Sequence, residues 1–325
     1  MKLSQRPRRN RRTESIREMV AESSLEARHL IYPVFICEGK KQKQAISSMP
    51  GQCRWSLDEL EKIMPSWLEL GLRAFALFPQ ISSDLKNPKG SESVNPAGLL
   101  PTVVQRLKKK FPEIVLITDV ALDPYSSDGH DGIVRNGEIL NDETVELLCQ
   151  MALLQAQVGS DFVAPSDMMD GRVRALRESL DKQGFEKTGI LAYSAKYASG
   201  FYGPFREALE SAPKAGDKKT YQMDPRNSRE ALREISLDLR EGADIVMVKP
   251  ALSYLDIIQS AKKISNVPIA AYNVSGEYAM VKAAAQAGWI DEKKVTLEIL
   301  TSIRRAGADL ILSYHAPEAL MWLKE

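Results

Sequence analysis

Two lysines stand where short apolar segments end. Lys196 closes Tyr193-Ser194-Ala195-Lys196, and Lys249 closes Met247-Val248-Lys249. A buried ammonium group is costly unless it is paired, and it usually responds by losing its proton. Two close lysines also lower each other's pKa by repulsion, and a neutral amine is the form that attacks a carbonyl carbon. The pair predicts a Schiff-base enzyme. The alternative for a single lysine is a salt-bridged side chain that reaches solvent, but two on adjacent strands favour catalysis.

A polar loop carries most of the other candidate groups. It contains Asp119, Asp123, Asp128, His130 and Asp131. Carboxylate oxygens are ligands for divalent cations, and carboxylates with an imidazole can also transfer protons. Aspartate and glycine are common turn residues too, so the loop alone does not decide between these roles.

The segment from residue 200 to residue 226 links the two strands that carry the lysines. It is long for such a connection, and long connections are often active-site lids. Its polar residues include Arg206, Lys214, Lys218, Lys219 and Gln222. Cations on a closing lid are suited to holding a substrate carboxylate. A solvated loop with ordinary surface charges is the alternative.

Eight short apolar runs are spaced along the chain. The strands that they predict must position the lysines and the polar residues named above. The runs are Ile31–Ile36, Ala74–Phe78, Ile114–Thr118, Phe162–Ala164, Gly189–Tyr193, Ile245–Val248, Pro268–Tyr272 and Leu310–Ser313. They are continuous rather than alternating, which is typical of parallel strands buried on both faces. Segments with helical spacing lie between them, for example Leu57, Leu60 and Ile63.

The alternation of strands and helices predicts an α/β fold, a closed (β/α)8 TIM barrel rather than an open doubly wound sheet. Three helix-to-strand joints repeat a Gly-x-Asp phrase at Gly159, Gly242 and Gly307. Neither a dinucleotide-binding loop nor a P-loop occurs. Residues 1–30 precede the first strand and predict an N-terminal arm, with a helix over Ser15–Ala21, that contacts a neighbouring subunit. Residues 31–325 form the predicted catalytic barrel.

A barrel places its active site at the carboxyl ends of its strands. Hydroxyls and carboxylates follow several predicted strands there, including Asp119, Ser166, Tyr272, Ser275 and Tyr314. We expect Ser166 to be a substrate-binding residue.

Composition excludes several classes of protein. The 325 residues include 44 Lys and Arg against 43 Asp and Glu, a balance that argues against nucleic acid as the main partner despite the basic run from Arg6 to Arg12. No apolar run is long enough to span a membrane. Cys37, Cys53 and Cys149 are far apart and predict neither disulfides nor a zinc cluster, which favours a cytoplasmic location.

The sequence resembles the porphobilinogen synthase (5-aminolevulinate dehydratase) family. The motifs that carry the resemblance span nearly the whole chain. They are Val163 to Arg172, Tyr193 to Ser199, Phe201 to Arg206, Val246 to Pro250 and Val274 to Tyr278. The resemblance implies a barrel with an arm that embraces a partner subunit, usually in a homo-octamer. The implied reaction joins two 5-aminolevulinate molecules into porphobilinogen with loss of two waters, an early step of tetrapyrrole and haem synthesis.

Roles for single residues are implied by the same resemblance. Lys249 matches the lysine that forms the Schiff base with the A-side substrate, and Lys196 matches the one that binds the P-side substrate. The implied carboxylate binders are Arg206, Lys218 and Gln222 for the P-side, and Ser275 and Tyr314 with the adjacent Tyr272 for the A-side.

One departure from many family members concerns metal. Their three-cysteine zinc site falls in the loop after the third strand, where this chain has Asp119, Asp123 and Asp131 but no cysteine. Thiolate zinc ligation is therefore impossible there. The chain resembles an aspartate-rich branch in which Mg²⁺ stimulates activity, and Glu234 matches a magnesium ligand near a subunit interface. The alternative for Glu234 is an exposed helical carboxylate. Asp123 and Asp131 are expected to act as acid/base groups or to hold a weak cation.

Two other functions use the same barrel. A class I aldolase also forms an imine on a barrel lysine, but it needs only one and usually binds phosphate. A non-catalytic scaffold needs neither lysine. The paired lysines and the cationic segment favour the synthase.

Overall fold

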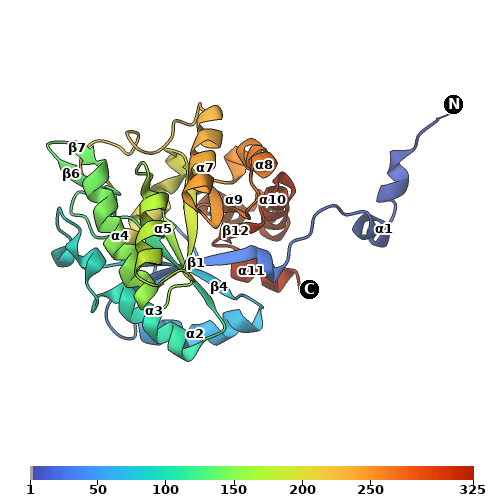
Figure 1. Ribbon diagram of the computed structural model, residues 1–325. Coiled ribbons are helices and arrows are strands. Elements are labelled where there is room, and N and C mark those ends of the chain that lie inside the picture. The colour runs from blue at the N-terminus through green and yellow to red at the C-terminus, as the bar shows by residue number, and fades with distance from the viewer. Residues whose placement is uncertain (1–2) are drawn as a thin grey trace.

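The eight predicted strands are all present, and all are parallel. The computed structural model describes residues 3–325 (Figure 1). The strands are β1 (Leu30–Cys37), β4 (Ala74–Gln80), β5 (Val115–Val120), β8 (Phe162–Pro165), β9 (Gly189–Lys196), β10 (Ile245–Lys249), β11 (Ile269–Asn273) and β12 (Leu310–Ser313). Strands β9 and β10 are longer than predicted, so each lysine is the last residue of its strand.

The sheet closes on itself. Each strand pairs with the next in the order β1, β4, β5, β8, β9, β10, β11, β12, and β12 pairs with β1 through Leu30↔Ile311 and Ile31↔Leu312. Closure removes the exposed sheet edges that an open doubly wound fold would have. The predicted (β/α)8 barrel is confirmed.

Helices cover the outside of the barrel (Figure 1). They are α2 (Leu57–Glu69), α3 (Leu99–Lys110), α4 (Asn141–Gln157), α5 (Arg172–Lys182), α7 (Arg229–Glu241), α8 (Leu255–Ile264), α9 (Ser275–Gln286), α10 (Glu292–Ala306) and α11 (Ala316–Trp322). Their apolar faces pack on the strands. In α2, for example, Leu60, Met64 and Trp67 are buried at helical spacing.

The repeated Gly-x-Asp motif forms the connections between helices and the amino ends of the strands that follow them. Gly242 and Gly307 adopt positive φ angles of 101° and 121° directly after α7 and α10, a backbone conformation that costs glycine least. Asp244 and Asp309 then accept hydrogen bonds from backbone N–H groups near the start of the neighbouring strands, those of Ile190 (2.8 Å) and Ile269 (3.0 Å). The phrase therefore ends a helix and ties adjacent strands together.

Four short strands were not predicted. They are β2 (Lys43–Ala45), β3 (Cys53–Trp55), β6 (Ile133–Arg135) and β7 (Glu138–Leu140). The β6–β7 pair is an antiparallel hairpin whose turn is Asn136-Gly137, both with positive φ. Asn-Gly is the sequence that favours such a two-residue turn. Each strand has only three residues, too short for a periodic signal.

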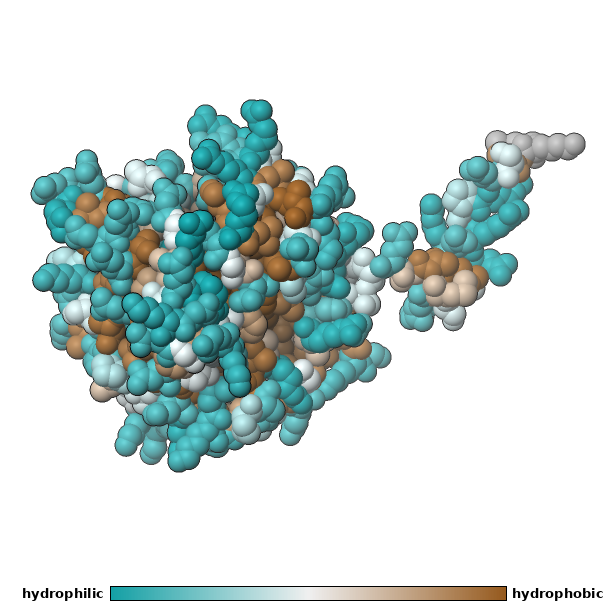
Figure 2. Space-filling model, viewed as in Figure 1, coloured by the Kyte–Doolittle hydropathy of each residue, from teal (hydrophilic) through white to brown (hydrophobic). Residues whose placement is uncertain are grey.

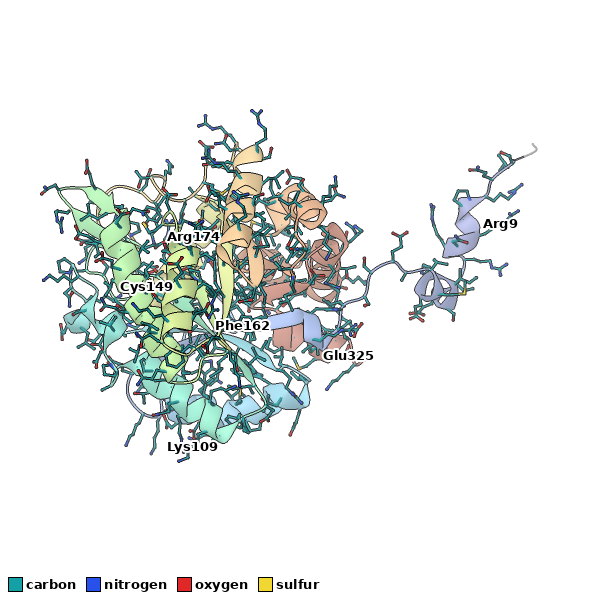
Figure 3. The ribbon with its side chains drawn as sticks, in the orientation of Figure 1. Arg9, Lys109, Cys149, Phe162, Arg174 and Glu325 are labelled. Carbon is teal, nitrogen blue, oxygen red and sulfur yellow. The ribbon has the colours of Figure 1, made fainter. Side chains whose placement is uncertain are left out.

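The chain before β1 extends away from the barrel (Figure 1). It contains a 3-10 helix, η1 (Pro7–Arg11), and the short helix α1 (Glu14–Met19), which ends two residues before the predicted helix does. Apolar atoms gather over α1 (Figure 2), where Met19 is 77% exposed. Arg9 lies on the far part of this arm (Figure 3). Residues 1–2 of the predicted arm lie outside the described residues.

No helix within residues 3–325 is both long and apolar enough to span a membrane.

Candidate active site

Lys196 and Lys249 are paired neighbours at the carboxyl ends of β9 and β10. Along β10, Ile245 and Met247 face the barrel interior, and alternation brings Lys249 to the same face. In β9 the register shifts by one residue, because Ala192 pairs with Val246 whereas Ala195 pairs with Val248. The extra residue is a bulge that turns Lys196 toward the interior beside Lys249.

The Lys249 ammonium nitrogen lies inside a box of aromatic rings. The ring centroids are 4.5 Å away for Tyr272, 5.0 Å for Tyr193, 5.1 Å for Phe205 and 5.2 Å for Tyr202. Among residues 3–325 no carboxylate forms an ion pair with it. Burial, followed by the charge of Lys196, lowers the pKa of Lys249 to about 7. A substantial neutral fraction therefore exists near neutral pH, as nucleophilic attack requires.

Lys196 has a different environment. Its Nζ is 3.0 Å from Oδ2 of Asp131 and also donates to the carbonyl oxygen of Ser166. The other carboxylate oxygen of Asp131 accepts a hydrogen bond from Lys218. One fully buried carboxylate is therefore paired with both Lys196 and Lys218. Burial alone would raise the pKa of Asp131, but the lysines hold it well below its usual range. Of the two predicted Schiff-base lysines, Lys196 is therefore ion-paired and Lys249 is not.

Asp119 and Asp123 complete the polar side of the site. Asp119 is buried, and its Oδ1 has no hydrogen-bond partner among the described residues. Burial and then the charge of Asp123 raise the pKa of Asp119 to about 7. Asp123 lies 3.5 Å from Lys218 Nζ. Asp119 can therefore gain and lose a proton near neutral pH, which suits general acid–base chemistry.

The segment over residues 200–226, called the lid from here on, covers the lysines. It begins with a 3-10 helix, η5 (Gly200–Tyr202), and the helix α6 (Gly203–Leu209). Arg206, Lys218 and Gln222 line one small cavity together with Lys196 and Lys249. The cavity measures about 20 Å³, room for about one water. The Oε1 atom of Gln222 is buried without a partner among the described residues.

Lys218 is already paired with Asp131 and Asp123, whereas no ion pair of Arg206 occurs within residues 3–325. Of the three predicted P-side carboxylate binders, Arg206 and Gln222 are the ones with unused hydrogen-bonding capacity.

The predicted A-side residues lie at the carboxyl ends of the neighbouring strands, with Tyr272 in β11 and with Ser275 and Tyr314 just after β11 and β12. The hydroxyls of Tyr272 and Tyr314 are 2.9 Å apart, and both residues are buried. Ser275, the first residue of α9, accepts from the backbone N–H of Phe205 at 3.0 Å and so contacts the lid. Ser166 contributes its carbonyl oxygen to Lys196. These residues are brought to the same end of the barrel as the lysines.

Glu234 does not lie among these groups. It is on α7 and lines a separate pocket of about 520 Å³, whose acidic residues are Glu138, Asp170, Glu230 and Glu234. Burial raises the pKa of Glu234, and the nearby Arg172 lowers it in part. The lining contains no lysine or arginine, and its carboxylate oxygens are ligands of the kind that a hard cation takes.

Sequence reasoning missed the aromatic box. Tyr193 stands three residues before Lys196, and Tyr202 and Phe205 lie in the lid, but nothing in their spacing indicated that their rings surround Lys249. The three cysteines are free thiols, and Cys149 lies on α4 (Figure 3).

The fold and site define a (β/α)8 barrel with two buried lysine side chains at the carboxyl ends of adjacent strands, beneath the lid. Comparison with known proteins specifies the family. The family model described as delta-aminolevulinic acid dehydratase matches residues 4–322, and the chain belongs to this family.

Individual relatives agree over almost the whole chain. The chloroplastic delta-aminolevulinic acid dehydratase of Physcomitrium patens is 55% identical over 324 residues, which cover 98% of this chain and 74% of that protein. The enzyme of Chlamydia pneumoniae is 52% identical over 323 residues, 99% of this chain and 97% of that protein. A crystal structure of the Toxoplasma gondii enzyme, porphobilinogen synthase in complex with its product porphobilinogen, superposes with a TM-score of 0.97. It is 53% identical, and the match covers 98% of this chain and 92% of that one.

Proposed function

We propose that this chain condenses two molecules of 5-aminolevulinate into porphobilinogen with loss of two waters, through Schiff bases on Lys249 and Lys196. The observation that carries the proposal is the pairing of these buried lysines at adjacent strand ends. Holding both substrates in one pocket removes much of the entropic barrier to joining them.

Lys249 is the A-side nucleophile. Its neutral amine adds to the ketone carbon of one substrate, and the carbonyl oxygen leaves as water when the imine forms. The aromatic box supports both states: it excludes water, which favours the neutral amine, and its ring faces attract the protonated imine that follows. The protonated imine withdraws electrons, so the adjacent carbon loses a proton more easily and can form the new carbon–carbon bond.

Lys196 binds the P-side substrate in the same way. Asp131 must release part of its hold on Lys196 before that amine is free to react, because a paired ammonium is not a nucleophile. Asp119, with its pKa near 7, and Asp123 are the acid/base groups within reach of the lysines.

The substrate carboxylates are held at two places. Arg206 and Gln222 from the lid, with Lys218, bind the P-side carboxylate, and Ser275 and Tyr314 with Tyr272 bind the A-side carboxylate. Ser166 contacts the substrate next to Lys196. The cavity is smaller than either substrate, so the lid must open to admit them and close for the reaction.

Magnesium is the expected cation, at Glu234 rather than at the lysines. The acidic pocket supports this site because its oxygen donors suit Mg²⁺. Bound there, Mg²⁺ would neutralise carboxylates that line the pocket and stimulate activity allosterically. The lysine site itself operates without cysteine-bound Zn²⁺, since no cysteine occurs in its loop.

The arm (residues 1–30) is proposed to embrace a second subunit in a homo-octamer, while residues 31–325 form the catalytic barrel. The exposed apolar residues of the arm, Met19 and Val20, support a protein contact. Three free thiols are consistent with a reducing compartment, and we propose the cytoplasm.

Borohydride reduction in the presence of 5-aminolevulinate, followed by peptide mass mapping, tests the proposal. The Lys249 and Lys196 peptides should each gain substrate mass, and Lys249→Met should abolish both its own adduct and porphobilinogen formation in a colorimetric assay. A protein in which neither peptide is labelled does not use Schiff bases. An aldolase would be labelled at one lysine and would form no porphobilinogen.

A further inference from the structure

The lid docks onto the polar loop of residues 119–131, called the aspartate loop from here on. The backbone N–H of Lys214 donates to the carbonyl oxygen of Asp128 at 3.0 Å. Gly129 has a φ of 73°, and a side chain there would overlap the backbone of Ala212 in the lid. The two segments are therefore fitted to each other over several residues, although about 85 residues separate them in the chain.

His130 is the centre of this contact. Its Nε2 is 2.9 Å from the carbonyl oxygen of Ala215, and its Nδ1 is 3.0 Å from the hydroxyl of Tyr221. A carbonyl oxygen only accepts, so Nε2 must carry the proton. In the neutral ring Nδ1 is then an acceptor, and the Tyr221 hydroxyl donates to it. One buried imidazole thus makes two hydrogen bonds, both to the lid.

Tyr221 continues the connection to the catalytic groups. Its hydroxyl oxygen also accepts the backbone N–H of Asp131 at 3.3 Å. Asp131 is the carboxylate shared by Lys196 and Lys218. Lys218 is three residues before Tyr221 in the lid, and the backbone N–H of Tyr221 donates to its carbonyl oxygen. The hydroxyl therefore lies between the lid and the carboxylate that contacts Lys196.

We propose that His130 and Tyr221 form a latch that holds the lid closed on the aspartate loop and positions Asp131 between Lys196 and Lys218. Both are positioning residues, since neither lines the cavity that holds the two lysines. The role of the latch in substrate binding rests on the proposed function, but the closure of the lid does not.

The first test replaces the hydroxyl alone. Tyr221→Phe removes two hydrogen bonds, the one to His130 and the weaker one from the Asp131 N–H, so amide hydrogen exchange of the lid should be at least about threefold to tenfold faster without substrate, the effect of one ordinary hydrogen bond, while exchange of the barrel strands is unchanged. The KM for 5-aminolevulinate should rise by a similar factor, and kcat should fall less. Tyr254→Phe is the matched control, because the Tyr254 hydroxyl makes no hydrogen bond within residues 3–325 and its ring stacks on Tyr197.

The second test measures separately the contributions of the two hydrogen bonds that His130 makes to the lid. The amide of His130→Asn occupies roughly the place of Nδ1 and can keep the bond to Tyr221, whereas the amide of His130→Gln reaches roughly the place of Nε2 and can keep the bond to Ala215. Each variant should retain more lid protection than His130→Ala. Tyr221→Phe should cause a smaller loss in the His130→Gln background than in the unaltered protein, because the bond to Nδ1 is already gone and only the bond from the Asp131 N–H remains to be lost.

The outcomes separate the two proposals. Lid exchange and KM in Tyr221→Phe equal to those of Tyr254→Phe would overturn the latch. If the unaltered protein formed no porphobilinogen, the proposed function would fail, yet the exchange measurement would still decide whether the latch exists.

Discussion

The pKa of Lys249 predicts how Schiff-base formation depends on pH. With a pKa of about 7, half of the amine is neutral at pH 7, whereas about one in 3,000 amines is neutral for a lysine of ordinary pKa. The reactive fraction is therefore about 1,500 times larger than at an exposed lysine. Since the folded pKa is lowered, the neutral form increases as the pH rises through 7 and changes little above about pH 8.

The assay mixes protein with 5-aminolevulinate for a short time, quenches with borohydride and measures the Lys249 adduct by mass spectrometry. The initial rate should follow a single titration with a midpoint near pH 7. A midpoint above about pH 9 would show that burial does not bring this pKa close to neutrality, and would refute the reasoning.

Phe205→Ala tests the cause of the lowered pKa. Loss of this ring admits water to the Lys249 ammonium, so the midpoint should move toward higher pH. The aromatic faces also attract the cation, which by itself would raise the pKa, so a downward shift would show that this attraction outweighs burial. Phe185→Ala, half-buried before the amino end of β9, is the control and should leave the midpoint unchanged.

Two further predictions concern charge and metal. Asp131→Asn leaves two buried lysines without their shared carboxylate, so the free energy of unfolding should fall by about 3–5 kcal/mol in a denaturant titration. Asp217→Asn, which breaks the exposed ion pair with Lys219 on the same lid, should cause no measurable change; equal losses would contradict the burial argument. For the metal, chelation should lower activity, and Glu234→Gln should abolish the heat of Mg²⁺ binding in calorimetry. N-ethylmaleimide should leave activity largely intact, because burial raises the pKa values of all three thiols; strong inhibition by this reagent would count against a cysteine-independent site.

The barrel was predictable because its signals are local. A strand buried on both faces is a continuous apolar run, and the Gly-x-Asp phrase marks the joint that precedes it. The strand ends were less predictable. Ser194 and Lys196 are polar, so the apolar run of β9 stops at Tyr193 although the ladder continues to Lys196.

Some site residues were predictable by type and position, and others were not. A lysine at a strand end predicts chemistry because burying its charge is costly, and this holds for Lys196 and Lys249 alike. The difference between them could not be predicted. One is paired with Asp131 and the other is surrounded by aromatic rings, because side chains from separate elements meet only in the folded chain.

The sequence by itself determined the eight-stranded barrel, the two lysines at its mouth and the lack of cysteine in the aspartate loop. These follow from residue type and periodicity along the chain. Only the tertiary structure decided that a bulge in β9 turns Lys196 beside Lys249, that Asp131 links Lys196 to the lid, and that His130 and Tyr221 join the lid to the aspartate loop. These features depend on the register between strands and on the distances between segments that lie far apart in the chain. Neither can be read from the residues of one local segment.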